Sequence, residues 1–246
     1  MATFTRRNLP HWQPAGAVIF VTYHLFGSLP ARVAERLEAE RRRLEGEPPR
    51  EGESPRDRGL REGKRMFALA DRALADQLRG GPAQAVRYLE DPRVARMVRE
   101  NLAFHDGTRF RLHRFVIMPN HVHVLIEPLP VEVAQAASLC LDSCATSEMH
   151  RQAASATTTA PAVGAYWPLS RIMHGLKSYT ANQANRLLER QGAFWQEESF
   201  DHWVRDAEEY GRIVAYIDAN PVEAGLCERA DAWVWSTPWE EGQGAS

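Results

Sequence analysis

The sequence predicts an α+β fold in which helices cover one face of an antiparallel sheet. Residues 16–26 and 109–128 are rich in β-branched and aromatic side chains, which is typical of strands. Pro119-Asn120 divides the second run into two strands joined by a tight turn. The order strand, helices, strand, strand, helix, strand, helix suits this fold class.

The remaining elements follow from apolar periodicity and from proline and glycine breaks. Residues 31–45 form a charged helix with a narrow apolar stripe, and the Pro/Gly-rich stretch GEPPREGESPRDRG after it is expected to be a loop. Helical periodicity resumes at Met66, stops at Gly80-Gly81-Pro82 and restarts near Asp91. Further along we expect a helix over 169–190, an extended segment over 194–203, and a helix over 206–219 that Asn220-Pro221 ends.

A single domain over residues 1–240 is the simplest organisation for a chain of 246 residues. Residues 31–90 then form a helical and loop insertion within it. Residues 131–165 form an Ala/Ser/Thr-rich flexible insert, and residues 241–246 a tail.

Composition restricts the cellular setting. The formal net charge of -2 is less basic than expected for a protein that grips long duplex DNA. Three cysteines give no disulfide framework, and no apolar run reaches the ~20 residues that a membrane span needs. We therefore expect a reduced, cytoplasmic protein that does not bind membranes.

His121 and His123 are the first candidates for chemistry. Alternate residues of a strand share a face, so both imidazoles point the same way, roughly 6.5–7 Å apart at their Cα atoms. They can converge on one metal ion, although a polar pair on a solvated strand face gives the same pattern.

Tyr179 and Gln183 are the second candidates. They lie four residues apart on the helix expected over 169–190, at one edge of its apolar stripe. Side chains in this position can lean over the rim of a sheet, although an ordinary boundary tyrosine would fit the periodicity equally well.

Several motifs together resemble one family. Residues 118–126 (MPNHVHVLI) resemble the His-hydrophobic-His motif of the single-tyrosine HUH transposases, and residues 178–183 (SYTANQ) are similar to their tyrosine helix. Four further motifs resemble the branch of REP-associated tyrosine transposases: residues 7–10 (RNLP), 16–22 (GAVIFVT), 194–203 (FWQEESFDHW) and 216–226 (YIDANPVEAGL).

The resemblance implies a ferredoxin-like fold with the histidine pair on a central strand. By motif, His121, His123 and Gln183 would bind a divalent metal, Mg²⁺ or Mn²⁺, and Tyr179 would be the nucleophile. Its attack on a phosphodiester would leave a 5′-phosphotyrosine and a free 3′-OH, which conserves the bond energy for strand transfer. No residue could be named as the base that activates the tyrosine.

The implied partner is single-stranded or hairpin DNA of the repetitive extragenic palindrome type, bound by a monomer or a homodimer. Arg6 and Arg7 are candidates for DNA contact, or are simply solvated N-terminal charges.

Two other functions remain open from the sequence. The chain could be a DNA-hairpin binder that has lost catalysis, or a metal-dependent hydrolase that uses water as its nucleophile. The hydrolase would need acidic or additional histidine ligands that sequence spacing does not place.

Overall fold

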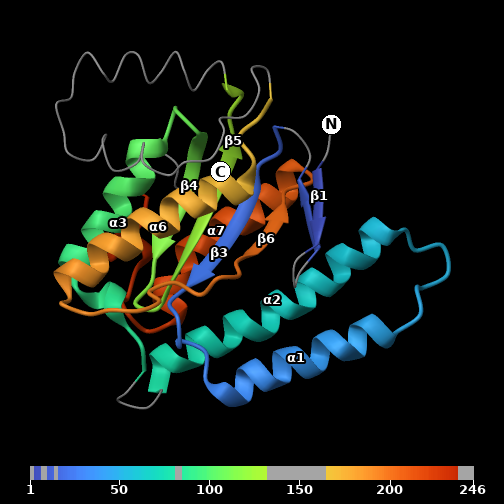
Figure 1. The fold of residues 1–246 in the computed structure, drawn as a ribbon, viewed down its shortest axis with the longest axis horizontal. Coiled ribbons are helices and arrows are strands. Elements are labelled where there is room, and N and C mark those ends of the chain that lie inside the picture. Colours follow the sequence, from blue (N-terminus) through green and yellow to red (C-terminus); the bar gives the residue numbers. More distant parts are fainter. Residues whose placement is uncertain (1–2, 7–9, 14–15, 81–84, 132–164, 238–246) are drawn as a thin grey trace.

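The computed structural model describes residues 3–6, 10–13, 16–80, 85–131 and 165–237, with side chains from residue 16 onward except at residues 56 and 80. Its helices and strands are shown in Figure 1. In chain order they are β1 (Thr3–Arg6), β2 (Pro10–Gln13), β3 (Ile19–His24), α1 (Ala31–Gly46), α2 (Pro55–Gly80), α3 (Pro92–His105), β4 (Phe110–Ile117), β5 (His121–Pro128), α6 (Leu169–Leu187), β6 (Phe200–Trp203) and α7 (Ala207–Glu223). The predicted insert over 131–165 and the tail over 241–246 lie almost wholly outside these residues.

The main sheet has four antiparallel strands in the order β4-β5-β3-β6. With α3 between β3 and β4, and α6 between β5 and β6, the chain follows the β-α-β-β-α-β path of the ferredoxin-like fold. The α+β class and the antiparallel sheet are thus confirmed. The segment expected to be extended over 194–203 is shorter than predicted, because only Phe200–Trp203 joins the ladder beyond an isolated bridge at Trp195.

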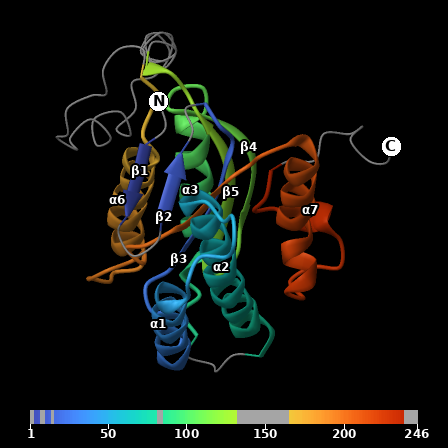
Figure 2. The same ribbon diagram turned by 90° about the vertical axis from the view of Figure 1, so that its right-hand side faces the viewer.

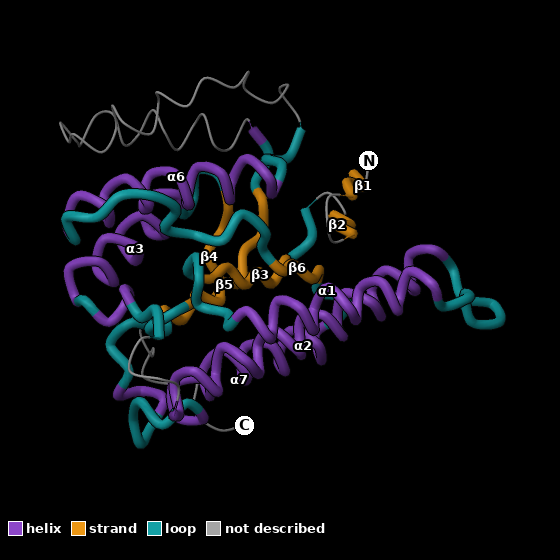
Figure 3. The backbone as a smooth tube through the Cα atoms, turned by 60° about the horizontal axis from the view of Figure 1, so that its bottom comes forward, coloured by secondary structure: helices purple, strands orange, loops and turns teal. Residues whose placement is uncertain are grey.

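The two faces of the sheet carry different helices. On one face, α3 and α6 bury a core that includes Val122, Val124 and Ile126 of β5. On the other face, Phe20, Val116 and Leu125 pack with residues of α2 and α7. Figures 2 and 3 show this arrangement, with α6 and α7 on opposite sides of the strands. The ferredoxin helices lie on one face as predicted, and the second face is covered as well because its central strands are also apolar.

The insertion contains a hairpin of two long helices, α1 and α2, which extends along the lower edge of the molecule in Figure 1. The expected loop is shorter than predicted, because α2 begins at Pro55 rather than near Met66. Ser54 caps this helix by accepting a hydrogen bond from the Asp57 backbone N–H at 3.1 Å. Proline at the first helical position and an acidic residue in the first turn complete a helix start that the charged composition concealed.

The last helix is longer than predicted. Pro221 was expected to end it, but α7 continues to Glu223. A proline in the final turn costs a single backbone hydrogen bond, and Gly225, at φ +72°, provides the left-handed residue that ends the helix. As a result, Tyr216 and Asn220 lie on one side of the same regular helix.

No helix among the described residues is long and apolar enough to cross a lipid bilayer.

Candidate metal centre and active site

The two histidines lie at the start of β5, on the face of the sheet that α2 and α7 cover. His121 is 1% exposed and His123 is fully buried. Their Nε2 atoms are 3.0 Å apart, so both rings converge on one point. The strand alternation predicted from the sequence is confirmed, but the pair faces a closed interior rather than solvent.

Asn120 determines which nitrogen of His121 carries the proton. The Asn120 Nδ2 donates to the backbone carbonyl of Leu74 at 3.1 Å, which turns its Oδ1 toward His121 Nδ1 at 2.6 Å. Because an amide oxygen only accepts, Nδ1 of His121 must be protonated, and its Nε2 presents a lone pair to the centre of the site. Thr22 has the corresponding position beside His123, with its Oγ1 2.6 Å from Nδ1.

A carboxylate reaches the same point from the helical insertion. Asp71 of α2 places its Oδ1 3.5 Å from His123 Nε2. Asp71, His121 and His123 form a group whose ligand atoms all lie within 4.8 Å of one another. This supplies the acidic residue that sequence spacing did not place.

Tyr216 of α7 is the tyrosine that the fold brings to the histidines. Its hydroxyl donates to Asp71 Oδ1 at 2.6 Å and lies 3.4 Å from His123 Nε2. Asn220, one turn later and also buried, donates its Nδ2 to the Tyr216 backbone carbonyl at 3.2 Å, and its amide is close enough to affect the pKa of His123 and of Tyr216. The site therefore joins two histidines, an aspartate, a tyrosine and an asparagine from three elements.

Burial governs the protonation of these groups. It lowers the pKa of His123 to about 3, and it lowers the pKa of His121 with a further contribution from the neighbouring His123. Both imidazoles are therefore neutral at pH 7, as metal ligands must be. Burial, followed by the Asp71 charge, raises the pKa of Tyr216, so its hydroxyl needs a proton acceptor before it can attack.

The residues present fit a divalent metal ion. The His121 and His123 Nε2 atoms point at each other across 3.0 Å, where a divalent cation would replace the proton that the two nitrogens otherwise share. Imidazole and carboxylate or amide oxygen together form a donor set that Mn²⁺ accepts, and Mg²⁺ favours the oxygen ligands.

The predicted tyrosine and its glutamine lie elsewhere. Tyr179 and Gln183 belong to α6, which packs on the opposite face of the sheet. Burial there, followed by the charge of Glu100 of α3, raises the pKa of Tyr179. One chain therefore does not bring Tyr179 to His121 and His123. The predicted placement of Tyr179 beside the two histidines is therefore not found within one chain. The prediction rested on helix periodicity, which does not show which face of the sheet a helix covers.

The remaining predicted contact residues cannot be placed. Arg6 ends β1, but its side chain is not among those described, and Arg7 lies outside the described residues. Their contact with DNA stays a prediction.

Sequence reasoning missed Tyr216, Asn220 and Asp71. A signal for the first two was present, because Tyr216 and Asn220 repeat the four-residue tyrosine–amide spacing of Tyr179 and Gln183, inside a motif already noted at 216–226. Asp71 carried no such signal, since it lies 50 residues before His121 and only the tertiary fold joins them.

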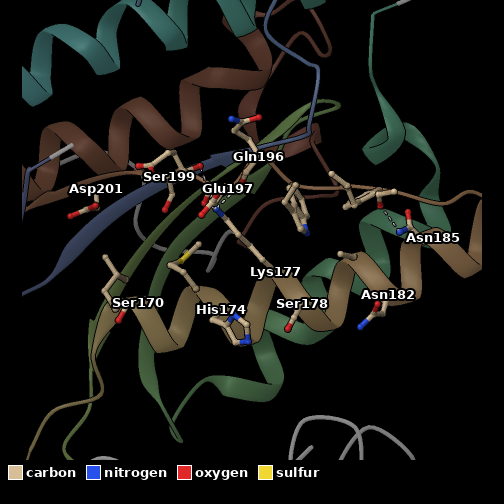
Figure 4. A pocket seen from close by; sticks show the side chains of 18 residues that line it. Ser170, His174, Lys177, Ser178, Asn182, Asn185, Gln196, Glu197, Ser199 and Asp201 are labelled. Carbon is tan, nitrogen blue, oxygen red and sulfur yellow. Dashed lines mark hydrogen bonds between the residues drawn. The ribbon is translucent and has the colours of Figure 1, made fainter. Parts of the chain in front are cut away.

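A cavity of about 620 Å³ lies between α6 and the segment before β6, away from the histidines (Figure 4). Lys177 points across it and donates to the backbone carbonyls of Gln196 and Glu197, both at 3.0 Å. This ammonium fixes the segment that leads into β6, and burial lowers the pKa of Lys177 to about 8.

Comparison with known proteins gives one distant likeness. No protein-family model matches the chain, and no curated protein matches it. A solved structure described as the REP-associated tyrosine transposase bound to a REP hairpin is 13% identical to it, with a TM-score of 0.45. The match covers 96% of this chain and 82% of that chain. The likeness is too distant to assign a role to any residue.

Thr22→Val is expected to weaken metal binding by about 10- to 100-fold while leaving the fold intact. The change removes the oxygen beside His123 Nδ1, which orients the ring, but it preserves shape in a strand. Titration of Mn²⁺ by calorimetry measures the effect, with Thr22→Ser as the variant that should retain affinity. If Thr22→Val bound Mn²⁺ as tightly as the unmodified chain, Thr22 would have no role in orienting the His123 ring.

The metal-free protein is expected to lose stability steeply in acid. Burial lowers the pKa of His24 to about 4 and of His105 and His123 to about 3, whereas an unfolded histidine titrates near 6.5. Between these values the unfolded chain binds more protons, so the free energy of unfolding falls as pH falls. At about 1.4 kcal/mol per pH unit for each group, the slope near pH 5 is about 4 kcal/mol per unit. Urea unfolding in the presence of chelator at pH 7, 6 and 5 measures this slope. A free energy of unfolding that does not change with pH would contradict the conclusion that these histidines are buried in the neutral form.

Proposed function

We propose that this chain is a metal-dependent single-strand DNA endonuclease and strand transferase of the HUH type, acting on hairpin DNA, with Tyr216 as its nucleophile. The single observation that carries the proposal is the convergence of the Tyr216 hydroxyl, His123 Nε2 and Asp71 Oδ1 within 3.5 Å of one another. The resemblance of residues 118–126 and 216–226 to HUH transposases supports the choice of substrate.

Each residue has a role in this reaction. A bound divalent ion would polarise the scissile phosphate. His121, His123 and the Asn220 amide would hold it, while Asp71 holds the Tyr216 hydroxyl and is placed to accept its proton. The Tyr216 oxygen then bonds to phosphorus as the bond to the 3′ oxygen breaks. The products are a 5′-phosphotyrosine and a 3′ oxygen that takes a proton from solvent.

The test is formation of a denaturant-resistant protein–DNA adduct. Labelled single-stranded hairpin oligonucleotides, taken from sequences flanking the gene, are incubated with Mn²⁺ or Mg²⁺ and separated on a denaturing protein gel. The proposal expects an adduct that chelator abolishes. Binding without adduct or cleavage, over both metals and a range of hairpins, would instead favour a non-catalytic hairpin binder.

Asp71 also favours a second candidate, the metal-dependent hydrolase. Two histidines and one carboxylate form a donor set with open positions for water, and Asp71 supplies the acidic ligand. In that enzyme water attacks and no covalent adduct forms, so cleavage that survives in Tyr216→Phe would identify it.

Side chains of α2 must give way for either reaction, by a shift small enough to leave Asp71 within reach of the Tyr216 hydroxyl. The histidines are at most 1% exposed, and Asp71, Phe67 and Leu74 of α2 lie over or beside them. A phosphodiester therefore cannot reach Nε2 in the arrangement described.

Spin labels can measure this movement. We expect the distance between labels at Arg72→Cys on α2 and Glu208→Cys on α7 to lengthen when hairpin DNA binds. A control pair at Arg96→Cys and Arg186→Cys, on α3 and α6, should keep its distance. Cleavage with both distances unchanged would show that the strand enters without displacing α2.

A further inference from the structure

A second cavity, of about 370 Å³, lies between the helical insertion and the end of β3. This volume is within the range of roughly 300–1,000 Å³ that is usual for small-ligand sites. Its walls come from both parts of the molecule: Leu37 and Arg41 of α1, Met66 of α2, and Phe26 and Leu29 after β3. The cavity thus exists only because the insertion is present.

The cavity reaches the metal centre through His24, which lines it. His24 is paired directly with His121 in the register of β3 and β5. Residues opposite one another in an antiparallel pair have Cβ atoms roughly 5 Å apart, so the floor of the cavity is one residue from a metal ligand. A group bound here belongs to the nucleotide at the scissile phosphate or to its neighbour.

Phe26 gives the cavity an aromatic rim. Its side chain is 55% exposed, which is unusual for a large apolar residue, and it lies at the opening. The backbone beneath it is fixed, because the Phe26 N–H donates to the Phe194 carbonyl at 2.8 Å and Leu25 is bridged to Trp195. An exposed aromatic ring on a fixed backbone is the arrangement that stacks on an unpaired base.

The interior is suited to a planar group with polar edges. Leu29, Leu37 and Met66 provide apolar walls. Arg41 and Glu38, joined by an ion pair at 2.7 Å, provide donors and an acceptor beside them. A nucleobase has this combination of apolar faces and hydrogen-bonding edges.

We propose that this cavity binds one unpaired nucleobase of the DNA strand next to the scissile phosphate, stacked on Phe26, and so sets which phosphate enters the metal centre. The proposal rests on the proposed function for the identity of the strand. It gives the α1–α2 insertion a role in positioning the substrate.

The test uses the full chain carrying Tyr216→Phe, so that binding is measured without covalent capture. Phe26→Ala is expected to weaken binding of a single-stranded hairpin oligonucleotide about tenfold, and Phe26→Trp to retain it. Val234→Ala is the matched control, since Val234 is also exposed but lies outside the cavity. Oligonucleotides with 5-iododeoxyuridine at successive positions should photocrosslink to the peptide containing Phe26 from one position only.

The outcomes separate this proposal from the function on which it rests. Unchanged binding in Phe26→Ala, with no crosslink near Phe26, overturns the cavity proposal even if the otherwise unmodified chain forms an adduct. A crosslink to Phe26 without any adduct in that chain supports the cavity and rejects the catalytic function. A chain that binds no strand rejects both.

Discussion

Tyr216→Phe is expected to abolish the covalent protein–DNA adduct, by at least about 10³-fold, while Tyr179→Phe leaves it unchanged. The phenylalanine ring retains the contacts with Phe20 and Phe67 but removes the phenolic hydroxyl that lies 3.4 Å from His123 Nε2. Tyr179 contributes nothing in the same chain because it lies on the other face of the sheet. Adduct formation on denaturing gels, with both variants beside the unmodified chain, measures the difference.

A mixing experiment tests the alternative in which two chains exchange α6. If Tyr179 of one chain served the histidines of another, Tyr179→Phe mixed with His121→Ala would form adduct although neither does alone. Our assignment expects Tyr179→Phe to be active by itself and the mixture to show no gain. Loss of adduct in Tyr179→Phe alone, with recovery on mixing, would reverse the assignment.

His123→Ala is expected to abolish both metal binding and the adduct. His123 Nε2 lies within 3.5 Å of His121 Nε2, Asp71 Oδ1 and the Tyr216 hydroxyl, so its loss removes the proposed ligand at the centre of the site. We expect Mn²⁺ affinity to fall by more than about 100-fold, beyond the effect of losing an orienting partner. Calorimetry and the adduct assay measure the two losses independently.

His174→Ala is the matched control. His174 is an exposed histidine on α6, so this substitution removes an imidazole from the surface instead of from the site. Since His123→Ala also leaves a buried gap, circular dichroism and a thermal unfolding curve must accompany the assay. A folded His123→Ala chain that binds Mn²⁺ normally would show that this cluster is not the metal site.

The sheet and the histidine pair could be predicted from local sequence. Period-two alternation fixes the shared face of His121 and His123, and Pro119-Asn120 fixes the turn between β4 and β5, because both depend on neighbouring residues alone. The order of elements then leaves few antiparallel arrangements, of which the ferredoxin-like one is observed.

The proposed nucleophile could not be chosen in the same way. Two helices each carry a tyrosine with an amide four residues later, Tyr179 with Gln183 and Tyr216 with Asn220. Periodicity shows that each pair lies on one side of its helix, but it does not show which face of the sheet the helix covers. That choice depends on long-range packing, which places α6 with Val122 and α7 with Leu125.

The insertion shows the same limit. The two helices of the insertion follow from local composition and capping, including the start of α2 at the Ser54 cap. The position of the insertion over the histidines does not follow from local sequence, because the contact of Asp71 with Tyr216 joins residues 145 positions apart. Consequently the role of residues 31–80 in closing the site became visible only in the folded chain.

Peptide mapping of the trapped adduct tests the central claim most directly. The unmodified chain is reacted with a single-stranded hairpin oligonucleotide and Mn²⁺, digested with nuclease and trypsin, and analysed by tandem mass spectrometry. Our account predicts a nucleotide attached through phosphate to Tyr216, in the peptide from Ile213 to Arg229. A nucleotide on Tyr179, or cleaved DNA with no modified tyrosine, would contradict it.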